Sequence, residues 1–169
     1  MKRVNYFEGQ LLGLDDFRAE QQYHREKRKM HNRFLHGWGV VSGLQVSVAD
    51  GALRVEPGLA LDCEGNEVLV PAPMACRLPQ SRTSAYLTVL YVERETDPAP
   101  APGTGDTDPV QHTRIDETFQ LGFEPEDPCV ACGPVRSPGC GRNHAVTLAK
   151  LAFTRAGWRV DRRFKAPRV

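Results

Sequence analysis

Three cysteines and one histidine near the C-terminus have the spacing of a metal site. They form the pattern Cys129-x2-Cys132-x7-Cys140-x3-His144. A Cys-x2-Cys pair can hold a tetrahedral metal from one tight turn, and a second short pair can complete a shell of soft ligands. Because a full shell leaves no open position, the pattern predicts a closed, structural Zn²⁺ site rather than a catalytic one.

The sequence around these ligands favours a metal for a second reason. Residues 124–143 are rich in Pro and Gly and offer no core of their own, so a structural zinc would supply the missing folding energy. Arg136 and Arg142 would help to keep the thiolates ionised. The alternatives are a loop with incidental thiols or an opportunistic disulfide. Cys63 and Cys76 stand alone in the sequence, and we interpret them as buried small residues.

Three histidines, His24, His31 and His36, fall within one stretch near the N-terminus. On a helix His24 and His31 would lie about 10 Å apart along the axis, too far to share one metal without other ligands between them. We interpret them as a polar seam that contacts the sheet or a partner. An enzyme that uses His24 or His31 is an alternative, although the chain contains no GxxxxGK[ST], GxSxG, HExxH or GxGxxG motif.

A basic run in the same stretch could meet phosphate groups. It consists of Arg25, Lys27, Arg28, Lys29 and Arg33. The formal net charge of +1 and the lack of interleaved aromatic residues argue against a nucleic-acid-binding protein. The simpler interpretation is a solvated helix face.

The three histidines and the basic run belong to one long predicted helix. Between Gly13 and His36 there is no Pro and no internal Gly, so nothing breaks a helix of about six turns. Asp15 and Asp16 lie in its first turn, where carboxylates favour the positive end of the helix dipole. Gly37 follows the last helical residue, where a left-handed cap favours glycine.

The helix separates into two faces at about 100° per residue. One face is apolar but carries imidazoles, which suits docking. The other is basic. The apolar face holds Phe17, Tyr23, His24, Lys27, Met30, His31, Phe34 and Leu35, and the basic face holds Arg18, Gln22, Arg25, Lys29, Asn32 and Arg33.

The rest of the chain has the alternation and turn signals of an antiparallel β protein. Short strands are predicted at 40–48, 53–55, 59–61 and 68–70 as a simple meander, with turns at Asp50-Gly51, Pro57-Gly58 and Glu64-Gly65-Asn66. A central strand at 85–92, a strand at 114–123 and a hairpin at 146–160 follow. The tail at 162–169 is either frayed or docked on a neighbour.

The expected fold class is α+β and mostly β. A long N-terminal helix precedes an antiparallel β-sandwich or barrel of about seven to nine short strands. We divide the chain into an N-terminal segment and docking helix at 1–37 and a β domain at 38–169. Within the β domain, a Pro-rich loop at 97–109 and a Cys-rich loop at 124–144 lie outside the core.

Composition is that of an ordinary soluble globular protein, with 40% hydrophobic and 25% charged residues. No apolar run approaches the roughly 18 residues of a membrane helix, and the N-terminus lacks the apolar core of a signal peptide. We therefore expect a cytoplasmic protein without a membrane partner. In that compartment cysteines are typically reduced thiols or metal ligands.

Two blocks of the sequence carry a family resemblance. The first, within 5–44, reads YFEGQLL, an acidic helix start, then QxYHxxKRxxHNRxLHGWGVVSGL; the second, at 55–71, contains VxPGLALDxxGNEV. Together they resemble uncharacterised bacterial proteins encoded among genes for phage-tail-like contractile injection particles. The second block resembles segments of phage tail and baseplate proteins. Weaker similarity covers AYLTVLYVERETDP, RIDETFQL and the closing VTLAKLAF…GWRVDRRF hairpin.

The resemblance implies a non-catalytic structural or adaptor role in a phage-tail-like particle, with particle proteins or further copies of the chain as partners. No catalytic residue comes with it. The helix and the YFEGQLL segment are the expected contact, because aromatic and aliphatic anchors dominate interface energetics. The anchors we predict are Phe7, Leu11, Leu12, Phe17, Phe34, Leu35 and Trp38. The alternative is a stand-alone, zinc-stabilised module that binds a small ligand or a peptide.

Overall fold

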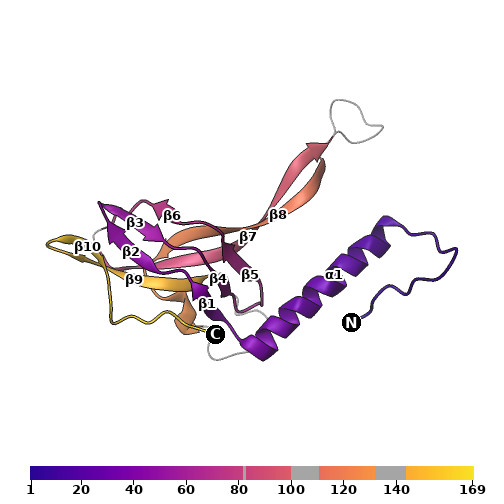
Figure 1. The fold of residues 1–169 in the computed structure, drawn as a ribbon, viewed down its shortest axis with the longest axis horizontal. Coiled ribbons are helices and arrows are strands. Elements are labelled where there is room, and N and C mark those ends of the chain that lie inside the picture. The colour runs from indigo at the N-terminus through magenta and orange to yellow at the C-terminus, as the bar shows by residue number, and fades with distance from the viewer. Residues whose placement is uncertain (82, 100–110, 132–143) are drawn as a thin grey trace.

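A computed structural model describes residues 1–81, 83–99, 111–131 and 144–169 (Figure 1). Helix α1 (Leu14–His31) continues into a π-helical turn, η1 (Asn32–His36), and is followed by β-strands. The strands are β1 (Gly39–Gly43), β2 (Val46–Ala49), β3 (Ala52–Val55), β4 (Gly58–Leu61), β5 (Glu67–Val70), β6 (Met74–Cys76), β7 (Ala85–Ala99), β8 (Gln111–Glu124), β9 (Val146–Thr154) and β10 (Gly157–Val160), with a 3₁₀ turn η2 (Pro128–Ala131) before β9.

The strands form three antiparallel sheets with the orders β1-β4-β5, β2-β3-β6 and β10-β9-β7-β8. The prediction of a mostly β protein with one N-terminal helix is therefore confirmed. The finer prediction is not: the described residues contain ten strands, more than expected, and three sheets that do not clearly make a single sandwich. Strand β7 lies between β8 and β9, which confirms the predicted central position of residues 85–92.

The start of the helix follows the predicted local chemistry, and its end follows it only in part. The Gly13 N–H donates a hydrogen bond to Asp16 Oδ2 at 2.9 Å, so the acidic first turn stabilises the start of the helix. At the other end Gly37 has a positive φ of 86°, which favours glycine, but its ψ of −145° is not that of the predicted left-handed cap. Its N–H donates to Asn32 O at 3.0 Å. That last bond spans five residues, so the final turn is wider than an α-helical one.

The predicted single strand at 40–48 is wrong, because the chain bends between β1 and β2. Gly43 and Leu44 have φ values of 61° and 57°, and the Leu44 N–H donates to Pro57 O at 3.1 Å. A Cβ on Gly43 would lie 1.9 Å from the same oxygen. The two halves of the predicted strand consequently belong to different sheets. The expectation of a simple meander is wrong as well, because β3 pairs with β2 and β6 while β4 pairs with β1 and β5.

The longest hairpin extends well beyond the body of the protein. Strands β7 and β8 pair from Tyr86↔Glu124 out to Ala99↔Gln111 and form an arm that projects from the sheets (Figure 1). The predicted Pro-rich loop at 97–109 therefore begins too early, because Asp97 and Pro98 still belong to β7. Its residues 100–109 lie outside the described part of the chain.

The core lies where the three sheets meet. Apolar side chains from every sheet are fully or almost fully buried together, which removes them from water and supplies the main stabilisation of the fold. They are Val40, Leu44, Leu53, Val55, Ala60, Val68, Val70, Leu87, Val89, Val146, Leu148 and Leu151. The helix contributes no buried residue between Leu14 and His31.

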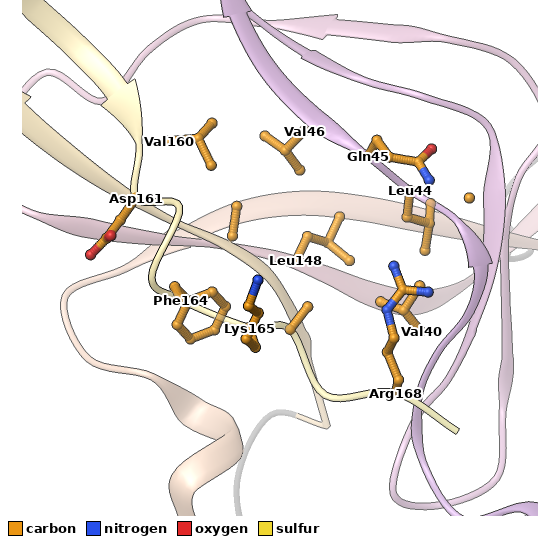
Figure 2. Close-up of a pocket in the computed structure, with 13 residues that line it drawn as sticks. Val40, Leu44, Gln45, Val46, Leu148, Val160, Asp161, Phe164, Lys165 and Arg168 are labelled. Atoms are coloured by element: carbon orange, nitrogen blue, oxygen red, sulfur yellow. The ribbon is translucent and has the colours of Figure 1, made fainter.

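The C-terminal tail packs on the chain's own β1. The Val40 N–H donates to Pro167 O at 2.8 Å, and Val40 pairs in parallel with Arg168. The expectation that this tail is frayed or docks on a neighbour is therefore wrong. Beneath the tail is a pocket of about 320 Å³ with an aliphatic floor that includes Leu148 and with Lys165 at its edge (Figure 2).

Candidate functional site

The helix contacts the β body through residues of its basic run. Arg25 forms an ion pair with Glu93 of β7, and Arg28 lies 3.6 Å from a carboxylate oxygen of Glu117 on β8. A second contact joins Arg28 to Glu67 of β5 at 3.8 Å. The interpretation of the basic run as a solvated face is thus wrong for Arg25 and Arg28, which meet carboxylates from three strands.

A partly buried tyrosine supports the Arg25 contact. The Tyr91 hydroxyl donates a hydrogen bond to the same Glu93 carboxylate oxygen at 2.9 Å. Burial raises the pKa of the Tyr91 phenol, and its hydrogen bond to Glu93 raises that pKa further. The phenol therefore stays protonated as a donor and helps to fix Glu93 for the helix.

The Arg25–Glu93 ion pair is expected to contribute a coupling energy of about 0.5–1 kcal/mol, because both side chains are partly exposed. A double-mutant cycle with Arg25→Ala and Glu93→Gln, measured by urea unfolding, tests this; Gln keeps an acceptor for Tyr91. The control is the Arg18–Asp15 pair within the helix, which is more exposed than Arg25–Glu93 and should give a coupling near zero. A coupling between Arg25 and Glu93 that survives 1 M salt unchanged would contradict an ion-pair origin.

The turn between β4 and β5 is the second anchor of the helix. Asn32, the buried residue of η1, donates from Nδ2 to Gly65 O at 3.0 Å and to Glu67 Oε1 at 3.1 Å. Gly65 has a φ of 89°, and a Cβ there would lie 2.3 Å from the carbonyl oxygen of Lys29. Only glycine lets the helix backbone approach this closely.

A buried carboxylate keeps this turn rigid. Asp62 Oδ1 accepts hydrogen bonds from the N–H groups of Glu64 and Asn66 at 2.9 and 2.8 Å, and Oδ2 accepts one from Asn66 Nδ2 at 2.7 Å. Burial raises the pKa of Asp62, while the hydrogen bonds from Asn66 act in the opposite direction. The LDCEGNEV sequence thus encodes both the turn and the surface on which the helix rests.

The predicted interface anchors lie mostly on the surface of the helix and the segment before it. The exposed fraction is 66% for Phe7, 93% for Leu11, 54% for Phe17 and 52% for Phe34. Leu12 and Leu35 are exposed as well, whereas Trp38 is partly buried. Tyr6 and Leu14, which we did not predict, are also exposed. We use the name apolar patch for the exposed residues of this set, which are Tyr6, Phe7, Leu11, Leu12, Leu14, Phe17, Phe34 and Leu35.

Between α1 and the β7–β8 arm lies a cleft of about 1010 Å³. The helix and the arm project from the same side of the β body (Figure 1). Leu14 and Arg18 line the cleft on the helix side, and His112 and Ile115 line it on the arm side. The N-terminal end of the helix, with Phe17, is therefore held away from the sheets.

The histidines occupy different positions from those expected. His24 Nε2 lies 2.8 Å from Glu20 Oε1 on the exposed helix surface. His31 and His36 approach each other through their Nε2 atoms at 3.2 Å, because the wide turn of η1 places them on one side. His24 and His31 are exposed and do not form the predicted seam against the sheet.

Two of the four predicted zinc ligands lie within the described residues, and Cys132 and Cys140 lie outside them. The Cys129 sulfur accepts a hydrogen bond from the Thr147 N–H at 3.2 Å in a buried position. His144 Nδ1 lies 3.0 Å from the sulfur of Cys63, a residue that has no other Cys or His near it in the sequence. Cys63 and Cys76 are both only partly buried. Among the described residues, no group of three or more His, Cys, Asp or Glu side chains is arranged to hold a metal.

Sequence reasoning missed the residues that position the helix. Glu93 and Glu117 come from strands far along the chain, and no local pattern points to them. For Asn32 and Gly65 a signal was present, because both fall inside the two blocks that carry the family resemblance.

No helix among the described residues is long and apolar enough to span a membrane.

Comparisons with known proteins identify solved structures with a related fold. No family model matches the chain, and no curated protein matches its sequence. A chain in the cryo-electron microscopy structure of the type VI secretion system TssK-TssF-TssG baseplate subcomplex aligns with a TM-score of 0.58 and 13% identity, over 100% of this chain and 62% of that one. A chain of the type VI secretion baseplate complex gives 0.56 and 13%, over 99% and 60%.

The crystal structure of TssK aligns with a TM-score of 0.57 and 12% identity, over 99% of this chain and 42% of that one. The chain therefore spans about three fifths or less of the length of the structures it matches. At these identities the likeness concerns the fold. The helix, the sheets and the arm together have the fold of a part of type VI baseplate structures.

Proposed function

We propose that this chain is a structural or adaptor component of a phage-tail-like contractile injection assembly. The observation that carries the proposal is the likeness to TssK and type VI baseplate chains, which extends over 99–100% of the chain. The resemblance in 5–44 and 55–71 points to the same class of particle from the sequence. The role is to hold partners in place, without a reaction of its own.

The contact surface in this proposal is the apolar patch. Its large apolar side chains are exposed along the helix and the segment before it, and such side chains are candidates for an interaction site because leaving them in water costs free energy. Arg25, Arg28 and Asn32 fix the helix on the β body, so the patch residues of the helix and of η1 are presented by a preorganised element. The partners are other proteins of the particle, further copies of this chain, or both, and the protein acts in the cytoplasm within the assembled particle.

Fractionation of cells that make the particle tests this function. The tagged chain is expected to sediment with contractile particles in a sucrose gradient and to cross-link to particle proteins through residues 6–17. A chain that stays entirely in the light fractions, in cells where particles are abundant, would overturn the proposal. A chain found only in the light fractions would favour the stand-alone binding module.

A further inference from the structure

A thiol and an imidazole, those of Cys63 and His144, lie in contact at the turn between β4 and β5. Cys63 Sγ lies 3.0 Å from Nδ1 of His144, although the two residues are 81 positions apart in the sequence. Thiolate sulfur and imidazole nitrogen are the two preferred ligands of Zn²⁺ in proteins. The fold therefore brings together two soft donors that the sequence leaves far apart.

The second ring nitrogen of His144 is oriented by a carboxylate. Nε2 lies 3.1 Å from Glu64 Oε1, on the residue next to Cys63. A metal-binding histidine almost always donates its other N–H to a carboxylate, a carbonyl or a water, which fixes the tautomer and the ring orientation. With the proton on Nε2, the lone pair of Nδ1 points towards the Cys63 sulfur.

From this arrangement we propose that Cys63 and His144 are two ligands of a tetrahedral Zn²⁺ site, with Glu64 as the carboxylate that orients the imidazole. Ligand bonds of about 2.3 Å for sulfur and 2.0–2.1 Å for nitrogen place the two donors about 3.5 Å apart in a tetrahedral shell. Opening the observed contact by about 0.5 Å is enough to admit the ion.

The surroundings suit a metal that enters from solvent. The His144 side chain is 23% exposed and Cys63 is partly buried, so both donors are reachable yet shielded. Asp62 holds the turn through three hydrogen bonds, which fixes the backbone on either side of Cys63 before any ion binds. A preorganised pair loses less conformational entropy on binding than two free side chains.

This site changes the ligand set that the Cys-rich spacing predicts. His144 is retained and Cys63 is added from a distant strand turn, which ties the zinc to the β body. The proposal rests on the contacts of Cys63, Glu64 and His144 and not on Cys132 or Cys140, which lie outside the described residues. Two protein donors fill half of a tetrahedral shell, and the measured number of thiolates will show what completes it.

Metal binding by the purified full chain tests the site. The probes are Zn²⁺, quantified by mass spectrometry after gel filtration, and Co²⁺, whose thiolate charge-transfer band reports each sulfur ligand. The wild-type chain is expected to retain one zinc. Cys63→Ser is expected to lose it and to weaken the cobalt band, whereas Cys76→Ser, the matched control at another partly buried thiol, retains both.

Two further variants separate a ligand role from a folding role. His144→Ala is expected to lose zinc and His144→Cys to retain it, because cysteine restores a soft donor at the same place. Glu64→Gln is expected to weaken zinc affinity 10- to 100-fold while the fold, followed by circular dichroism, is unchanged. A wild-type chain that takes up no zinc, or a Cys63→Ser chain with unchanged zinc content and cobalt band, would overturn the proposal.

Discussion

Replacing Phe17 and Phe34 together with alanine is expected to abolish co-purification with the particle while the isolated chain keeps its unfolding free energy. Both side chains are more than half exposed, so their removal leaves no cavity in the core. Buried aromatic anchors contribute about 2 kcal/mol or more each to an interface, which makes binding roughly 1,000-fold weaker for the pair. Sedimentation and urea unfolding of the same variant measure the two effects.

A matched control for this variant is Leu69→Ala combined with Ile115→Ala. These side chains are 60% and 55% exposed, on β5 and β8, and they lie outside the apolar patch. The control should sediment with the particle like the wild type. If the Phe17 and Phe34 variant unfolds far more easily than the control, the two rings belong to the core of the free protein, and the interface assignment is wrong.

Gly65→Ala is expected to release the helix from the β body and to destabilise the protein by about 3 kcal/mol. Part of that cost is the left-handed backbone, which costs an alanine about 1–2 kcal/mol, and the rest is the displacement of the helix by the new Cβ against Lys29. Urea unfolding gives the free energy. Hydrogen exchange of residues 14–31 shows whether the helix opens before the sheets do.

Gly51→Ala isolates the backbone part of this effect. Gly51 also has a positive φ, of 73°, but no atom lies within 4 Å of its missing Cβ. We expect a cost of about 1 kcal/mol and unchanged exchange in the helix. Equal costs for the two variants would mean that the helix moves aside freely, and that the contact at Gly65 does not anchor it.

The sequence predicts those features that depend on neighbouring residues. Asp16 and Gly37 bound the helix where capping chemistry requires, and Asp50-Gly51 makes the tight turn between β2 and β3. The partition into sheets was not predictable in this way. The bend at Leu44 depends on the carbonyl of Pro57, a contact that alternation of polar and apolar residues does not encode.

Strand β7 extends to Ala99, beyond the strand predicted at 85–92, and it contains a proline that argues against this extension. Pro98 normally argues against a strand, since it cannot donate a ladder hydrogen bond. Strand β9 pairs with β7 only from Ala85 to Val89, so at Pro98 only β8 is a neighbour, and no donor is needed on the other side. Edge position, which the structure reveals, makes the proline acceptable.

The candidate site was predicted only in part. Helical periodicity separates a basic face from an apolar one, but it does not say which face meets the sheets. That choice depends on Glu93 and Glu117, whose positions next to Arg25 and Arg28 follow from sheet registry. The contact between Cys63 and His144 is likewise not predictable from neighbouring residues, because the two lie 81 positions apart in the sequence.

The β7–β8 arm has a mechanical consequence. Beyond Val92 it is a two-stranded ribbon whose residues 111–117 are all exposed, so cross-strand pairing carries almost all of its stiffness. A two-stranded ribbon is marginally stable in water by itself. We therefore expect the arm to bend easily. Near its base, Glu93 and Glu117 connect it to the helix. We expect a load on the arm to reach the same arginines that hold α1, so that bending the arm tilts the helix.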